Sequence, residues 1–332
     1  MTPVFGRHRV SLLLATAAAT AVFAALLLGS TPLSLARVLQ GLIGSGDAAD
    51  TLVIWQIRLP RALTALLVGM SLGISGAALQ GLLRNPLAEP GILGVSATAS
   101  LFATFTLYYG LVGSFALALP LAAIVGALIA TALLVFAASQ TGSVVALILI
   151  GIGLSSFAAA LMSLLLNLAP NPFFLSDLIN WTLGTVANRS FADIGLALPF
   201  MATGIGILLA TAKGLSALSL GEEAASGIGL DVKRQRVLTV LGAGLASGAS
   251  VSLAGAIGFV GIVAPHIVRP FVGYDPARCL LPSALLGGLI VVCADIGVRL
   301  IPTSNELKLG VIAALVGAPI FIWIAAKRRG TA

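Results

Sequence analysis

Uninterrupted apolar stretches recur along the chain, and most hold about 20 residues, the length that an α-helix needs to cross the hydrocarbon core of a bilayer. The stretch at 257–268 is too short to cross untilted and the one at 92–109 is marginal, so the pattern alone predicts eight to ten spans. The stretches are 10–29, 60–83, 92–109, 114–138, 143–167, 192–212, 235–254, 257–268, 279–299 and 307–326.

Composition excludes a soluble globular enzyme. Hydrophobic residues make up 59% of the chain and charged residues 9%, against roughly 45–50% and roughly 25% in soluble domains. A soluble domain of this size needs a charged surface to stay in water, so the surface of this chain must face lipid. The sequence therefore predicts an all-α, polytopic membrane protein with about ten transmembrane helices in one domain, residues 1–332.

The basic residues predict that both termini are cytoplasmic, because cytoplasmic loops carry an excess of Lys and Arg. With ten spans, the cytoplasmic segments hold twelve of the 18 basic residues: Arg7, Arg9, Arg84, Lys213, Lys233, Arg234, Arg236, Arg269, Arg278, Lys327, Arg328 and Arg329. The outer segments hold six: Arg37, Arg58, Arg61, Arg189, Arg299 and Lys308. These six outer residues need an explanation of their own.

Three polar stretches connect the spans, at 31–58, 170–190 and 213–236. The second predicts a short helix on the outer side of the membrane. The third is the only sizeable cytoplasmic loop, and in it the acidic run at 222–225, flanked by glycines, predicts a short surface helix.

The sequence lacks motifs for catalysis or cofactor binding. No Walker A pattern occurs, so if ATP drives this chain, another subunit binds the ATP. The two cysteines and two histidines give no disulfide framework and no metal or haem signature. The net charge of +7 includes no basic run beyond Lys327-Arg328-Arg329, which is typical of a topology signal rather than of nucleic-acid binding. We therefore expect no catalytic residue, no metal and no cofactor.

Asp295 is the one carboxylate that the pattern places inside a span. An ionisable residue within the membrane indicates function by default. Arg299 lies four residues further on, however, so a helical ion pair could neutralise the charge. We favour this structural pair over a proton relay, because a proton-coupled carrier would need more buried carboxylates.

Two long motifs and several short ones carry a resemblance to a known family. Residues 58–97 read RLPRALTALLVGMSLGISGAALQGLLRNPLAEPGILGVSA, and residues 255–273 read GAIGFVGIVAPHIVRPFVG. Shorter matches lie at 218–225, 294–299 and 316–321. In this order along nearly the whole chain, they resemble the FecCD-type permeases, the membrane subunits of ABC importers for ferric siderophores, haem and cobalamin.

The resemblance implies partners as well as a fold. It implies ten spans per subunit, a homodimer with the transport pathway at its interface, two separate ATPase chains and a substrate-binding protein outside the membrane. The chain itself would then be no enzyme, and it would lie in the inner membrane of a bacterium.

Arg58, Arg61 and Arg299 match family arginines that meet glutamates of the binding protein on the periplasmic surface. This match would explain why they depart from the positive-inside rule, although anchoring to lipid headgroups is an alternative. Exposed pairs of this kind are individually weak, ~0.2–1 kcal/mol, but several together set docking register and association rate.

The loop at 216–230 resembles the coupling helices that sit in a cleft of the ATPase, and its matching residues are Gly221, Glu222, Ala225 and Gly229. The alternative for this loop is a solvated segment without a partner. A short helix flanked by glycines could act as a rigid lever moved by closure of the ATPase.

Asn85 and Leu87 match residues near the cytoplasmic constriction of the family's pathway, and the alternative is a structural turn. One departure concerns the gate. Cobalamin permeases carry a Thr-Ser pair at the start of the fifth span, where this chain has Val144 and Val145. A gate lined by valine would be drier, so the solute or the gating would differ from theirs.

The favoured interpretation is a permease subunit that moves a ferric siderophore by alternating access, with haem or cobalamin as alternative cargo. Two other classes compete with it. An ion-coupled secondary carrier is disfavoured by the scarcity of carboxylates within the spans, and a non-transporting receptor or scaffold by the lack of a soluble sensory domain.

Overall fold

The computed structural model describes residues 7–29, 31–113, 115, 117–141, 143–169, 172–302 and 306–327. Arg328, Arg329 and the first two residues of the 170–190 stretch therefore lie outside the described residues. Within those ranges every regular element is a helix. By length and composition, seven of these helices could cross a membrane, and shorter apolar helices lie at 95–108, 260–271 and 309–322.

Each of the ten apolar stretches forms a helix, so the all-α, polytopic fold is confirmed. The ten helices are α1 (Arg7–Leu27), α4 (Leu59–Leu82), α5 (Val95–Tyr108), α6 (Ala118–Gln140), α7 (Val144–Asn167), α9 (Phe191–Ala210), α12 (Val232–Ala254), α13 (Val260–Val268), α14 (Pro276–Leu300) and α15 (Leu309–Lys327). The connecting helices are α2 (Leu35–Leu42), α3 (Ala48–Leu52), η1 (Val53–Arg58), η2 (Pro90–Leu93), η3 (Leu111–Gly113), α8 (Pro172–Thr182), α10 (Ala212–Leu218), α11 (Glu222–Gly227) and η4 (Arg269–Phe271).

The second span begins earlier than the sequence indicates. The charges in 31–58 suggest a polar connection, but α3, the π-helical turn η1 and α4 continue into one another, so that 48–82 forms one apolar candidate span. Asp50 is buried because its carboxylate accepts two hydrogen bonds of 2.6 Å from Arg37 on α2. The pair with Arg37 thus allows the charged Asp50 to lie within this candidate span, although hydropathy alone assigns Asp50 to the polar connection before it.

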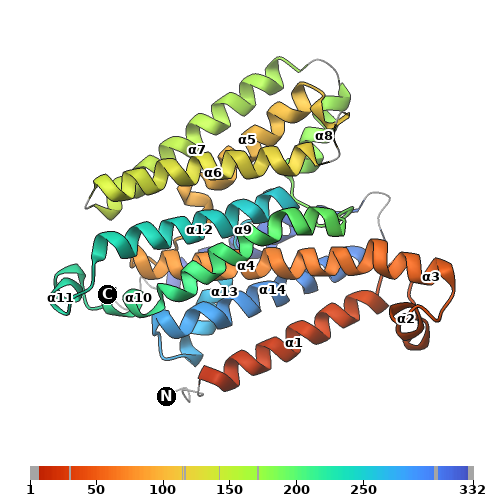
Figure 1. Cartoon of the computed structure of the whole chain (residues 1–332), viewed down its shortest axis with the longest axis horizontal. Coiled ribbons are helices and arrows are strands. Elements are labelled where there is room, and N and C mark those ends of the chain that lie inside the picture. The colour runs from red at the N-terminus through yellow and green to blue at the C-terminus, as the bar shows by residue number, and fades with distance from the viewer. Residues whose placement is uncertain are drawn as a thin grey trace.

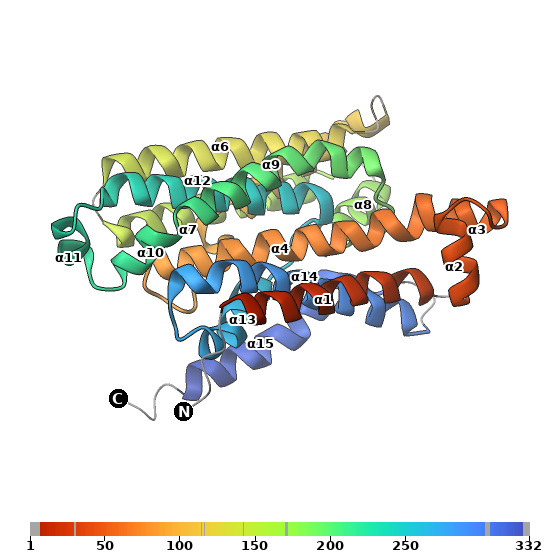
Figure 2. The ribbon, with the colours of Figure 1, turned by 60° about the horizontal axis from the view of Figure 1, so that its bottom comes forward.

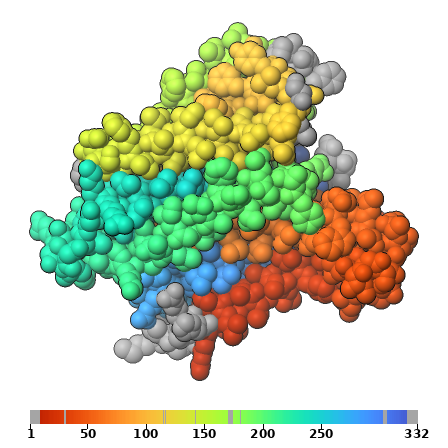
Figure 3. Space-filling view, in the orientation of Figure 1, coloured from red at the N-terminus to blue at the C-terminus, as the bar shows by residue number. Residues whose placement is uncertain are grey.

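The helices lie roughly along one direction, with α4 near the centre (Figure 1). The most extensive packing joins α4 to α14, while α12 packs against α6 and α9. The group α5–α7 lies on one flank, and the space-filling view shows α1–α3, in red and orange, on the opposite flank (Figure 3). The α2–α3 pair and α11 mark opposite ends of the bundle, and α1 begins and α15 ends at the α11 end (Figure 2).

Glycine permits the close approach of α4 and α14. A Cβ atom at Gly69 would collide with the backbone of Gly287, and one at Gly73 would collide with the carbonyl of Ser283. Small residues at such crossings let helix backbones approach each other, which in lipid replaces the hydrophobic driving force between helices. The α4–α14 contact therefore depends on the absence of side chains at these positions.

Substituting Gly73→Ala should destabilise the protein by about 1–3 kcal/mol, because the new methyl group must push two backbones apart. The matched control is Gly206→Ala on α9, where a Cβ would meet nothing within 4 Å. Thermal unfolding in detergent measures both variants. Equal melting temperatures for the two would contradict the packing argument.

Candidate functional site

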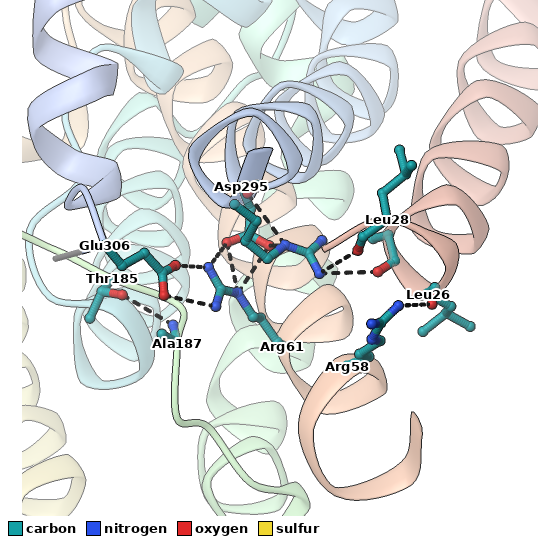
Figure 4. A network of polar contacts seen from close by, with 10 residues as sticks. Leu26, Leu28, Arg58, Arg61, Thr185, Ala187, Asp295 and Glu306 are labelled. Atoms are coloured by element: carbon teal, nitrogen blue, oxygen red, sulfur yellow. Dashed lines mark hydrogen bonds and ion pairs between the residues drawn. The ribbon is translucent and has the colours of Figure 1, made fainter. Parts of the chain in front are cut away.

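Two of the three arginines expected on the surface bind the end of α1 instead. Arg58 is 6% exposed, and its guanidinium donates to the carbonyl oxygens of Leu26 and Thr31 at 2.6 and 2.5 Å. Arg299 donates to the carbonyl of Leu28 at 3.2 Å (Figure 4). The last carbonyls of a helix lack partners within it and carry its negative dipole end, so these cations stabilise the C-terminus of α1.

Asp295 lies between two arginines in the interior. Its side chain is 1% exposed, and its carboxylate is 2.7 Å from Nη2 of Arg61 on α4 and 3.1 Å from Nε of Arg299 on its own helix. The spacing of Asp295 and Arg299 indicates the second contact from sequence. The first joins residues 234 positions apart, and nothing in a single sequence pairs them. Two arginines therefore share one buried carboxylate.

Glu306 approaches Arg61 from the other side, and sequence reasoning missed it. Its carboxylate contacts Nη2 of Arg61 and accepts from Nη1 at 3.3 Å. The Glu306 side chain is 40% exposed, whereas that of Arg61 is 11% exposed. Figure 4 shows the guanidinium of Arg61 held between the carboxylates of Asp295 and Glu306. This arrangement, the arginine cluster, consists of Arg58, Arg61, Arg299, Asp295 and Glu306.

A cavity of about 400 Å³ reaches this cluster at the α2–α3 end of the bundle. Its lining includes Arg61, Arg299 and Glu306, together with Gly29 and residues 298–302. The cluster holds three guanidiniums against two carboxylates, which leaves one positive charge. A cleft with a net positive charge attracts anions, so this cavity favours the binding of a carboxylate.

At the opposite end, α11 is the short helix that the sequence predicts at 222–225. Glycines with left-handed backbones bound it, Gly221 with φ +105° and Gly229 with φ +88°. Ala225 is buried, and Glu222 pairs with Arg236 of α12 at 3.1 Å. The side chain of Arg236 is itself buried and donates to a backbone carbonyl. The helix α11 is therefore fixed to α12 on one side and presents its other side to the surroundings.

The residues expected at a constriction lie on two different elements at the α11 end. Asn85 is exposed in the turn after α4, where its side chain accepts from the backbone N–H of Leu87 at 3.0 Å. Val144 and Val145 form the first turn of α7, and the side chain of Val145 is 64% exposed. The turn at Asn85 thus has its own structural bond, and Val145 leaves an apolar side chain uncovered.

Glu89 is another carboxylate whose partner lies far away in the sequence. It accepts a 3.1 Å hydrogen bond from the backbone N–H of Phe259, whose φ of +67° is left-handed. The ring of Phe259 in turn lies 6.4 Å from that of Phe321 on α15. Because the partner of Glu89 is a backbone group 170 residues away, residue types alone give no signal for it.

Comparison with known proteins agrees with the sequence motifs. A model of the FecCD transport family matches residues 15–327. The permease protein YvrB of an ABC transporter of Bacillus subtilis is 40% identical over 291 residues, which cover 86% of this chain and 81% of YvrB. The vitamin B12 import system permease protein BtuC of Salmonella typhi is 41% identical over 291 residues, 86% of this chain and 88% of BtuC.

A solved structure also matches over nearly the full length. It is an inward-facing conformation of a metal-chelate type ABC transporter, with a TM-score of 0.86 and 31% sequence identity. The match covers 96% of this chain and 99% of the solved one. The resemblance found in the motifs is therefore confirmed along the whole fold.

Replacing Asp295 with Asn should lower the free energy of unfolding by about 3–5 kcal/mol, because Arg61 and Arg299 would stay buried without their shared counter-charge. Asp47→Asn is the control, since Asp47 is exposed at the start of α3 and its side chain makes no capping bond. Thermal unfolding in detergent distinguishes the two. A wild-type melting temperature for Asp295→Asn would show that the buried pair contributes little.

Proposed function

The chain belongs to the FecCD transport family of ABC importer permeases, and on this premise we propose that it carries a ferric siderophore across the bacterial inner membrane. The match over 96% of the chain to a transporter of the metal-chelate type supports a chelated metal as the cargo, a class that includes ferric siderophores, haem and cobalamin. Cobalamin is the alternative that the 41% identity to the vitamin B12 permeases supports, and haem is the third. The family does not hydrolyse ATP itself, so the energy comes from a separate subunit.

Residues 1–332 act as one permease domain that works beside a second copy of the chain. The apolar surface of α7 is available for such a contact, because Val145, Leu149 and Phe157 are 64%, 62% and 63% exposed. A helix with so much uncovered apolar surface needs either lipid or another protein against it. In the homodimer these residues would border the pathway between the two copies.

The two ends of the bundle have different partners in this proposal. The α11 end faces the cytoplasm with both termini, as the excess of basic residues there suggests. Gly221, Glu222, Ala225 and Gly229 shape the coupling helix that two ABC ATPase subunits move. The α2–α3 end faces outward and receives the substrate-binding protein, and Arg58, Arg61 and Arg299 supply its positive charge.

Transport follows alternating access. A loaded binding protein docks at the outer end, ATP binding draws the two ATPases together, and their motion shifts α11 with the helices fixed to it. Asn85 and Leu87 lie beside the inner constriction, and Val144 and Val145 give it an apolar lining. A dry constriction of this kind would let a bulky chelate slide through without a tight binding site.

Reconstituted vesicles should take up a ⁵⁵Fe-labelled siderophore only when the ATPase and the binding protein are both present, and vanadate should block the uptake. Labelled cyanocobalamin and haem, offered in parallel, distinguish the three cargoes. Uptake driven by an ion gradient without the ATPase would identify a secondary carrier. Absence of transport of any of the three would favour a receptor or scaffold.

Enlarging Ala225 to Trp should displace α11 from the rest of the bundle and uncouple transport, because Ala225 is a buried residue of this helix. We expect uptake to fall at least about tenfold, a factor within the range of ordinary coupling between sites, with loss of ATPase stimulation by the loaded binding protein. The control is Ala202→Trp on α9, at an exposed position. Normal uptake and normal stimulated ATPase activity in Ala225→Trp would contradict the coupling role.

A further inference from the structure

The guanidinium of Arg61 has almost no hydrogen-bonding capacity left. An arginine offers five N–H donors in one plane. Nε and Nη2 of Arg61 bind Asp295 at 2.9 and 2.7 Å, and Nη2 and Nη1 bind Glu306. Both edges that could hold a carboxylate through two parallel bonds are therefore occupied within the chain (Figure 4). An incoming carboxylate can bind Arg61 in this way only if one of the two internal carboxylates leaves.

The two internal carboxylates differ in how easily they can leave. Asp295 is buried and also binds Arg299, so its departure would leave Arg299 in the interior without a counter-charge. Glu306 is 40% exposed, its only ion pair among the described residues is with Arg61, and it lines the cavity of the arginine cluster. Released into water, Glu306 would be solvated at once. Exchange at Arg61 is therefore favourable only at the edge that Glu306 holds.

A second arginine, Arg299, lines the same cavity. The Nη2 atom of Arg299 is buried and has no hydrogen-bond partner among the residues that the structure describes, and Arg299 lines the cavity beside Arg61 and Glu306. A buried donor without a partner is costly to maintain. Because neither Asp295 nor Glu306 satisfies this nitrogen, a carboxylate that enters the cavity would supply an acceptor that the described residues do not.

We propose that Glu306 occupies the site of a partner's carboxylate, and that docking of the substrate-binding protein exchanges Glu306 on Arg61 for an acidic side chain of that protein, which also reaches Nη2 of Arg299. This inference rests on the proposed function. It makes Glu306 a competitor that weakens docking and keeps it reversible.

The test measures the affinity of the assembled importer for its binding protein. The wild-type permease–ATPase complex, in lipid nanodiscs, first captures a binding protein from the periplasmic fraction of its own bacterium, and the purified protein is then titrated against each variant. Glu306→Gln should bind it about two- to fivefold more tightly, the factor expected for removing one exposed ion pair from competition. Its dissociation rate should fall accordingly.

Asp47→Asn is the matched control, because it removes an exposed negative charge from the same end of the bundle without touching Arg61. Simple long-range attraction would tighten binding equally in both variants, and that result would overturn the exchange. Weaker binding by a normally folded Glu306→Gln would also overturn it. Glu306→Asp, which keeps the charge but shortens the side chain, should tighten binding as well and serves if the first variant fails to fold. If the wild-type complex binds no periplasmic protein, the docking proposal itself is wrong and the exchange falls with it.

Discussion

The buried carboxylate of Asp295 holds the α2–α3 end of this bundle together. It neutralises Arg61 on α4 and Arg299 on α14, and Arg299, together with Arg58, binds the last carbonyls of α1. Three helices from distant parts of the chain are thus joined by one set of charge-assisted bonds. Because a buried charge without a partner is costly, each member of the set fixes the position of the others.

Rigidity below this cluster comes from a different source. Glycines on α4 leave room for the backbones of α14 and α13 to approach closely, and such packing supplies the association that hydrophobicity cannot supply in lipid. Charge therefore organises the α2–α3 end and close packing organises the middle, while α11, held by Glu222 and Arg236, is attached at the other end.

Residue pattern predicted the fold well and the functional site only in part. The ten apolar stretches and the short helix at 222–225 follow from hydropathy and glycine placement, which are local properties. The partners of Arg58, Arg61 and Glu89 do not, because they are carbonyls, carboxylates and an N–H contributed from far along the chain. The expectation of surface arginines gave way to arginines that are largely buried and reached through a cavity.

Multiple membrane spans and membership of one transporter family follow from the amino-acid sequence, because hydropathy and long ordered motifs are properties of neighbouring residues. The partners of the sparse charges, in contrast, are set by the packing of the helices. A charge that is buried within the bundle must find a partner in space, and spatial proximity between residues such as Arg61, Asp295 and Glu306 arises only when the helices pack.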